Sequence, residues 1–190
     1  HRWIVKRGDL AMLVLTFIAT LSFGIKIGIL SGVSASMCLL VFRAIRPHTV
    51  ILGRLPGTTT YRNVVNFPDA VVTDGIVAIR IDAEFFYGNV MHLKETLIAV
   101  VDSAEVPVHS IVIDATSVNQ LDSSADTALH ELHERFQRVG VEVFFAGTKG
   151  PVREVWERSG FNTRVGEDHF FIEVHDAMKA AKLRDSAQGI

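Results

Sequence analysis

The sequence predicts a short transmembrane helical hairpin followed by an α/β domain with a mostly parallel sheet and crossover helices. Two observations predict this fold class. Two uncharged apolar runs, residues 10–23 and 27–42, hold almost all of the chain's excess of apolar residues. After Pro47, strand-like and helix-like segments alternate, as they do when helices connect parallel strands.

The change in composition at Pro47 predicts the domain boundaries. We expect a membrane helix pair in residues 1–46, a linker with the first strand of the second domain in 47–75, and the body of that domain in 76–190. The first residue is His, which indicates a chain cut or processed from a longer protein.

The two apolar runs are better explained by two helices than by one. At about 1.5 Å per residue, about 16 residues reach roughly 24 Å, against a hydrocarbon core of roughly 30 Å. We therefore expect two short helices joined by a tight turn at residues 24–26. The alternative is one long tilted helix with Lys26 inside the membrane, where an uncompensated lysine costs at least about 2.5 kcal/mol.

Basic residues predict the orientation of the hairpin. They flank its two outer ends: Arg2, Lys6, Arg7, Arg43 and Arg46. Lys26 stands alone between the two runs. Since loops rich in Lys and Arg stay in the cytoplasm, both outer ends are expected there, together with the second domain, and Lys26 on the other side.

Small residues recur every four positions along the hairpin, at Gly24, Gly28, Gly32 and Ser36. Such a stripe lets another helix approach closely. We interpret it as a packing face toward membrane helices that this chain does not contain. The alternative is that glycine is simply common in membrane helices.

The second domain is expected to alternate strands and helices. Strands are predicted at residues 50–52, 76–81, 110–114, 141–146 and 170–172. Helices are predicted from a cap at Asn89 to 101, at 123–139, from Pro151 to Gly160, and at 174–183. The helix at 123–139 has apolar residues on one face, which is typical of a helix that covers a sheet.

The tripeptide Asp122-Ser123-Ser124 is the main candidate site. It follows the predicted strand at 110–114 and opens the helix at 123–139. A serine here can cap the helix, with Asp126 completing a variant capping box. Alternatively, an exposed hydroxyl at a helix start is a regulatory phosphorylation site, because the helix dipole favours added negative charge.

Other motifs point away from catalysis. The chain has no phosphate-binding glycine motif after a strand, no nucleophile elbow and no paired-carboxylate signature. His130 and His133 are spaced like half of a metal site, but the other ligands are missing, so we interpret them as a solvated polar face with Glu131 and Glu134. Cys38 is the only cysteine, which excludes a zinc site built from cysteines. We expect no enzyme activity, no metal and no cofactor.

Three segments carry a resemblance to a known family. Residues 111–161 resemble the STAS domain, the fold shared by anti-sigma-factor antagonists and the tails of sulfate permease (SulP-type) anion transporters. Residues 50–64 (VILGRLPGTTTYRNV) resemble the linker strand of the transporters, and residues 80–89 (RIDAEFFYGN) resemble the exit of their second strand.

The resemblance implies the C-terminal part of a secondary anion transporter, with sulfate as the default substrate and bicarbonate or another small anion as options. It makes residues 1–46 the last two spans and places the anion site on earlier helices, outside this chain. In the antagonists, the serine after the Asp of this tripeptide is phosphorylated by a partner kinase, and the matching residue here is Ser123. Ala125 stands where those proteins usually have glycine. The alternative function is a membrane-tethered STAS signalling protein of the antagonist type.

The same resemblance implies the location and the partners. We expect a multi-pass protein of the plasma or inner membrane with a cytoplasmic STAS domain that acts in regulation, assembly or partner binding. The expected partners are the remaining membrane helices, the lipid bilayer, a small inorganic anion, a regulatory protein at the STAS surface and a second copy of the chain. No nucleic acid is expected, because the net charge is -2.

Overall fold

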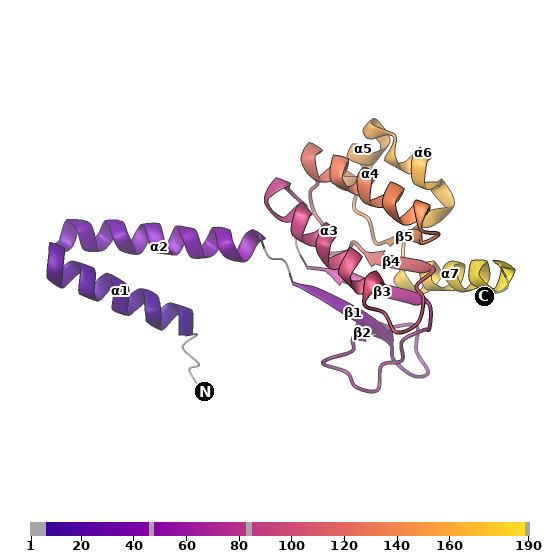
Figure 1. Cartoon of the computed structure of the whole chain (residues 1–190), viewed down its shortest axis with the longest axis horizontal. Helices are drawn as coiled ribbons and strands as arrows, with labels where there is room; N and C mark the ends of the chain where they lie inside the picture. Colours follow the sequence, from indigo (N-terminus) through magenta and orange to yellow (C-terminus); the bar gives the residue numbers. More distant parts are fainter. Residues whose placement is uncertain (1–6, 46–47, 83–84, 189–190) are drawn as a thin grey trace. The chain divides into compact units, whose positions relative to one another are not determined.

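The computed structural model describes residues 7–45, 48–82 and 85–188 (Figure 1). The chain divides into two compact units, His1–Arg46 and Pro47–Ile190. Each unit has its own internal packing. Arg2, Lys6 and Arg46, on which the predicted orientation depends, lie outside the described residues.

The first unit is a helical hairpin, as predicted. Helix α1 spans Arg7–Phe23 and α2 spans Ile25–Ile45. Gly24 alone makes the break, with a φ of 84° that residues with side chains rarely adopt. Lys26 therefore lies in the first turn of α2 and not in the turn between the helices, which corrects the predicted connection.

The second helix is also longer than predicted. Its 21 residues reach about 31 Å at 1.5 Å per residue, enough to cross the hydrocarbon core. Among the described residues, Ile25–Phe42 is the one helical stretch that is both long enough and apolar enough to cross a membrane. Leu10–Phe23 is a shorter apolar helix.

The second unit is built on a mixed sheet. Within the described residues it has six strands in the order β2-β1-β3-β4-β5-β6. Their bounds are Thr49–Arg54 (β1), Tyr61–Asn63 (β2), Ile76–Ile81 (β3), Ser110–Asp114 (β4), Glu142–Ala146 (β5) and Phe170–Phe171 (β6). Strands β3 to β6 are parallel, and β1 is antiparallel to both β2 and β3. The predicted α/β fold with a mostly parallel sheet is confirmed.

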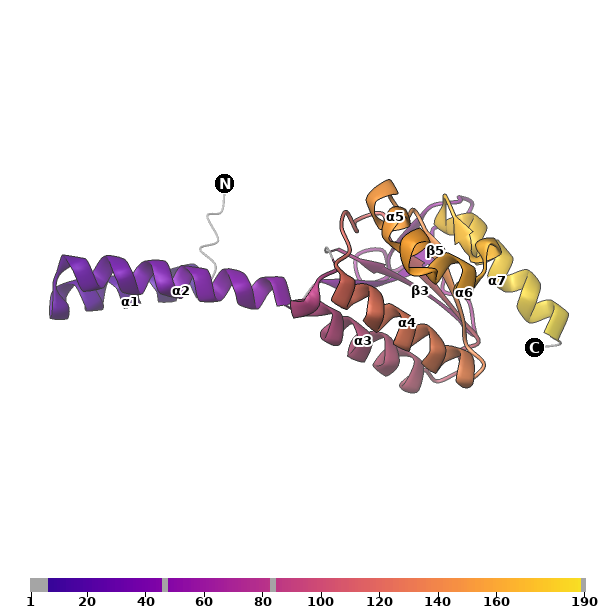
Figure 2. The same ribbon diagram turned by 90° about the horizontal axis from the view of Figure 1, so that it is seen from above.

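Helices cover both faces of this sheet (Figures 1 and 2). One face carries α3 (Tyr87–Asp102), α4 (Ser123–Arg138), α5 (Gly150–Ser159) and α6 (Phe161–Val165). Their core is continuous with the side chains of Ile79, Ile111 and Phe145. The other face carries the single helix α7 (Val174–Gln188), whose Ala177, Met178 and Ala181 pack on the sheet.

Local details depart from the predictions in two places. Asn89 does not cap α3: the cap position is Phe86, and the Asn89 side chain lies inside the first turn, where its Oδ1 accepts a hydrogen bond from the Phe86 N–H at 3.1 Å. Three short elements were not predicted, namely β2, α6 and the 3-10 turn η1 at Glu167–His169. They are three to five residues long, too short for apolar periodicity to reveal them.

Candidate functional site

The tripeptide Asp122-Ser123-Ser124 opens α4, as predicted, but the cap is Asp122. Its carboxylate accepts a hydrogen bond from the Ala125 N–H at 2.7 Å, and its backbone is extended. Ser123 and Ser124 form the first turn of α4, and both are exposed. The prediction of a serine cap was therefore wrong, because the acidic residue one position earlier already fills that role. The Ser123 hydroxyl is left on the surface.

Two neighbouring segments hold this helix start in place. The Phe85 N–H donates to the Gln120 carbonyl at 3.2 Å, and the Asp122 N–H donates to the Phe85 carbonyl at 3.2 Å. The Asp114 carboxylate, at the end of β4, accepts two hydrogen bonds from Thr116. One comes from the Thr116 N–H at 3.1 Å and the other from the Thr116 hydroxyl at 2.7 Å. The loop between β4 and α4 is thus tied at both ends, which fixes where Ser123 stands.

Polar residues from neighbouring strands gather at the same carboxyl edge of the sheet. Asp82 follows β3 and accepts from Arg80 Nε at 2.8 Å and from the Ser117 hydroxyl at 3.2 Å. Partial burial acts to raise the pKa of Asp82, but the hydrogen bond and charge of Arg80 outweigh it and lower that pKa. Lys149, after β5, donates to Asn119 at 2.5 Å. Open α/β sheets place their ligand surfaces at this edge.

Asp126, which the sequence places near Ser123, is turned away from it. It is only 7% exposed. Its carboxylate accepts from the Ser159 hydroxyl at 3.1 Å and lies 3.6 Å from His130 Nε2. The contact with Ser159 joins α4 to α5, and the contact with His130 lies within α4. Asp126 therefore belongs to helix packing, and Asp122 is the acidic residue at the helix start.

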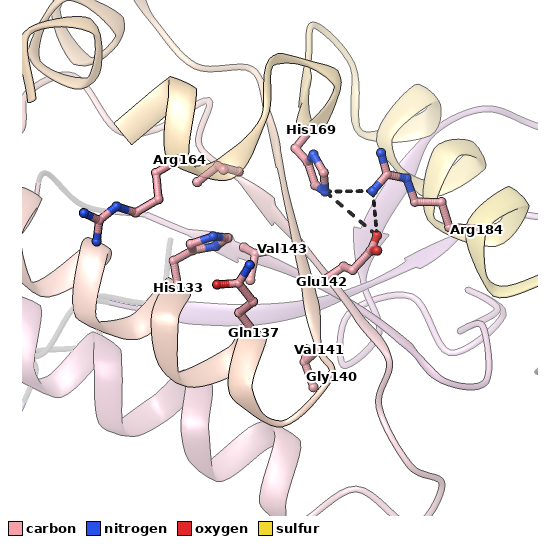
Figure 3. A pocket seen from close by; sticks show the side chains of 10 residues that line it. His133, Gln137, Gly140, Val141, Glu142, Val143, Arg164, His169 and Arg184 are labelled. Carbon is pink, nitrogen blue, oxygen red and sulfur yellow. Dashed lines mark hydrogen bonds and ion pairs between the residues drawn. The ribbon is translucent and has the colours of Figure 1, made fainter. Parts of the chain in front are cut away.

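A second polar cluster lines a cavity of about 340 Å³ at the amino end of β5 (Figure 3). Its lining comes from α4, α6, η1, α7 and the start of β5. Its polar members are His133, Gln137, Glu142, Arg164, His169 and Arg184. Figure 3 shows His133 and Gln137 beside each other, while His169, Glu142 and Arg184 form a separate group.

Both arginines of the cavity are already paired with carboxylates. Arg184 donates to Glu142 at 3.0 Å and also pairs with Asp168, and Arg164 pairs with Glu134. Slight burial acts to raise the pKa of Asp168, but the hydrogen bond from His169 and the positive charge of Arg184 lower it. This pairing removes the excess positive charge that an inorganic anion would need.

His130 and His133 do not form a solvated polar face, which corrects the prediction. Both rings lie edge-on to Phe161 of α6, with ring centroids 4.9 Å and 6.2 Å away. Partial burial lowers the pKa of His133, and the positive charges of nearby basic groups, Arg164 among them, lower it further against an opposing effect of Glu134. The prediction missed α6, which covers this side of α4. Within the described segments, no three His, Cys, Asp or Glu side chains are grouped as metal ligands.

The small-residue stripe lies partly inside the hairpin. A Cβ added to Gly28 would stand 1.9 Å from the Thr20 hydroxyl oxygen, and one added to Gly32 would stand 2.9 Å from that of Thr16. These two glycines therefore let α1 approach α2. Gly24 makes the break between the helices, and Ser36 is exposed. A role for the stripe toward membrane helices outside this chain stays a prediction.

The family model of the STAS domain matches residues 67–177, more than half of the chain. The chain belongs to the STAS domain family. The match includes β3 to β6 and the candidate surface around Ser123. It confirms the resemblance that the sequence carries in residues 111–161.

Relatives extend this similarity beyond the STAS domain into the hairpin. The chain is 33% identical to the probable sulfate transporter 4.2 of Arabidopsis thaliana over 186 residues, which cover 93% of the chain and 28% of the relative. It is 34% identical to the chloroplastic sulfate transporter 4.1 of the same plant, with 93% and 27% covered. A probable sulfate transporter of Mycobacterium tuberculosis is 29% identical, with 94% and 32% covered. The chain thus spans about a quarter to a third of the length of these relatives.

Solved structures agree on the fold. The murine anion transporter Slc26a9 in the inward-facing state matches with a TM-score of 0.80 at 21% identity, covering 95% of this chain and 30% of that one. A sulfate transporter family protein of Wolinella succinogenes matches with a TM-score of 0.53 at 24% identity, covering 64% and 97%. The hairpin followed by a STAS domain is therefore an arrangement that known membrane transporters share.

Proposed function

We propose that this chain is the C-terminal part of a secondary anion transporter, with sulfate as its default substrate. The observation that carries the proposal is the reach of the similarity: it covers 93% of the chain, the hairpin included, and the relatives are sulfate transporters. Two membrane helices do not make a pathway across the bilayer. The anion site belongs to membrane helices outside this chain, and residues 1–46 pack against them.

The STAS domain acts in regulation, assembly or partner binding, and it is not an enzyme. Its carboxyl edge has an exposed hydroxyl, a capping carboxylate and a Lys149–Asn119 pair, and the described residues there show no nucleophile held by a general base. This arrangement suits contact with another protein better than it suits chemistry on a small substrate. No cofactor is assigned to it.

Ser123 is the centre of the regulatory surface. Its hydroxyl is exposed at the positive end of a 16-residue helix, and Asp122 already provides the cap. A phosphate would add about 1.5 to 2 negative charges, with a dipole gain of roughly 0.3 to 1 kcal/mol that the Asp122 charge opposes. Because these terms nearly cancel, phosphorylation changes what binds here more than how stable the domain is.

The protein lies in the plasma or inner membrane with its STAS domain in the cytoplasm. The apolar length of α2 and the membrane transporters among the relatives support a membrane location. The basic residues at both outer ends of the hairpin support the cytoplasmic side for the domain. The lipid bilayer, a regulatory protein and a second copy of the chain are its proposed partners.

Transport by the full-length protein tests this function. The purified protein is reconstituted into liposomes, and uptake of radiolabelled sulfate is compared with empty liposomes, with bicarbonate and chloride as competitors. Uptake that sulfate saturates supports the proposal, and preferential inhibition by bicarbonate would reassign the substrate. Uptake of sulfate at the rate of empty liposomes, with the same result for labelled bicarbonate and labelled chloride in parallel assays, would overturn it in favour of a signalling protein.

A further inference from the structure

The end of α7 is attached to the amino edge of the sheet by a fork of hydrogen bonds. Arg184 Nη1 lies 3.0 Å from Glu142 Oε2 at the start of β5 and 3.0 Å from His169 Nε2 on η1 (Figure 3). The guanidinium also lies over the Phe144 ring, 5.6 Å from its centroid. One arginine thus holds the last helix to two other elements.

This fork requires one protonation state of His169. A guanidinium only donates hydrogen bonds, so His169 Nε2 must accept and carry no proton. The other ring nitrogen, Nδ1, lies 3.0 Å from the Asp168 carboxylate, to which it must donate. Stacking on Phe144, at 4.8 Å between ring centroids, keeps the ring in this orientation. His169 is therefore a neutral ring with its proton on Nδ1.

The rest of the cavity contains both basic and acidic side chains. His133 and Arg164 line it from α4 and α6, and neither ring nitrogen of His133 has a hydrogen-bond partner within the described part of the chain. The carboxylates that face His169 are Asp168 and Glu142, the latter 3.9 Å from Nε2. A proton on Nε2 would turn that nitrogen toward Glu142 and into competition with Arg184 for the same carboxylate.

We propose that this cavity is a proton sensor, in which protonation of His169 at Nε2 displaces Arg184 and releases the end of α7 from β5. Acidification operates it. The release is partial, because Ala177, Met178 and Ala181 still pack on the sheet. The part that is released is the C-terminal half of α7, the helix that packs on the second face of the sheet.

The contact between Asp185 and His109 opposes the release of α7 at low pH. Asp185, next in the chain, has its Oδ2 3.7 Å from His109 Nδ1, and its Oδ1 lies 3.5 Å from the Ser110 hydroxyl. Asp74 and Lys182 line the same side. Protonation of His109 strengthens its attraction to Asp185. The release at Arg184 is therefore expected to be larger when His109 is replaced by Gln.

Hydrogen exchange of the α7 amides in the complete 190-residue chain, held in detergent micelles, tests the sensor. Protection of residues 181–185 is measured at about pH 7.5 and about pH 5.5, corrected for the intrinsic pH dependence of exchange. We expect residues 181–185 to lose about fivefold more protection at the lower pH than β4 and β5 do, as for the loss of one hydrogen bond.

Three variants decide the cause. His169→Gln keeps an acceptor for Arg184 and a donor for Asp168 but cannot be protonated, so protection should stay high at both pH values. His92→Gln is the matched control on α3, away from the cavity, and it should keep the native response. A native chain whose protection does not change with pH would overturn the proposal, and so would a response that survives in His169→Gln and disappears in His133→Gln.

Discussion

The two edges of the STAS sheet differ in how their polar residues are held. At the carboxyl edge, Asp122 and Ser123 sit in consecutive positions of one loop and helix start, and they are exposed. At the amino edge, His133, His169 and Arg184 come from three elements and meet around a cavity. The first arrangement is local and leaves a side chain available to a partner. The second depends on tertiary packing, and its contacts are internal.

This difference predicts how mutations act. Changes at the carboxyl edge should alter partner binding and leave the domain folded, whereas changes around the cavity should alter stability and its dependence on pH. The following predictions go from the largest expected effect to the smallest.

Phe161→Ala should be the most destabilising change. Phe161 is 0% exposed and packs on Trp156 and Phe145 as well as on both histidines of α4. Removal of a buried Phe costs about 3–5 kcal/mol of unfolding free energy, and here it also removes the ring on which His130 and His133 pack. Denaturant unfolding in micelles, followed by circular dichroism, measures the loss. Ile172→Ala is the control, because Ile172 is 81% exposed and its removal should change little.

Asp122→Ala should have an intermediate effect. It removes the hydrogen bond to the Ala125 N–H and so the cap of α4, which costs about 1 kcal/mol. Ser123→Ala should cost less than about 0.5 kcal/mol, because Ser123 is exposed and is not the cap. Melting temperatures of the two variants give the comparison. A larger decrease in melting temperature for Ser123→Ala than for Asp122→Ala would show that Ser123 caps the helix.

Acid should weaken the domain through His133. Partial burial lowers the pKa of His133 from its usual 6.5, so the unfolded chain binds protons more readily than the folded one. The stability from this residue is complete above pH 6.5 and falls as the pH decreases toward the folded-state pKa. His133→Gln should make the unfolding free energy less dependent on pH in this window. An unchanged slope would show that other groups cause the acid effect.

Much of the fold follows from local pattern. The strands at 76–81 and 110–114 are mostly apolar segments, and the structure has them at the predicted bounds. The hairpin follows from two uncharged runs around one lysine. These features depend on neighbouring residues alone, so one sequence reveals them.

The two candidate sites, the helix start at Ser123 and the cavity at the amino end of β5, also differ in how far the sequence predicts them. The position of Ser123 at a helix start was predictable, because strand, loop and helix follow in order along the chain. The cavity was not predictable, because part of its lining comes from α6. This helix is five residues long, too short for a periodic apolar pattern to predict it. The burial of His133 and the meeting of His169 with Arg184 depend on that helix and on η1, so the histidine spacing on α4 pointed to solvent instead.

Sulfate transport by the full-length protein in liposomes, with charge added at the carboxyl edge, tests the central claim most directly. Ser123→Glu imitates a phosphate at the exposed helix start, and Thr127→Glu places the same charge one turn further along α4, also exposed. We predict that Ser123→Glu changes the uptake rate or the association with a regulatory partner, while Thr127→Glu leaves both at the native level and both variants stay folded. Equal uptake and equal partner association in both variants and the native protein would contradict the account and leave Ser123 as an ordinary surface residue of the first helical turn.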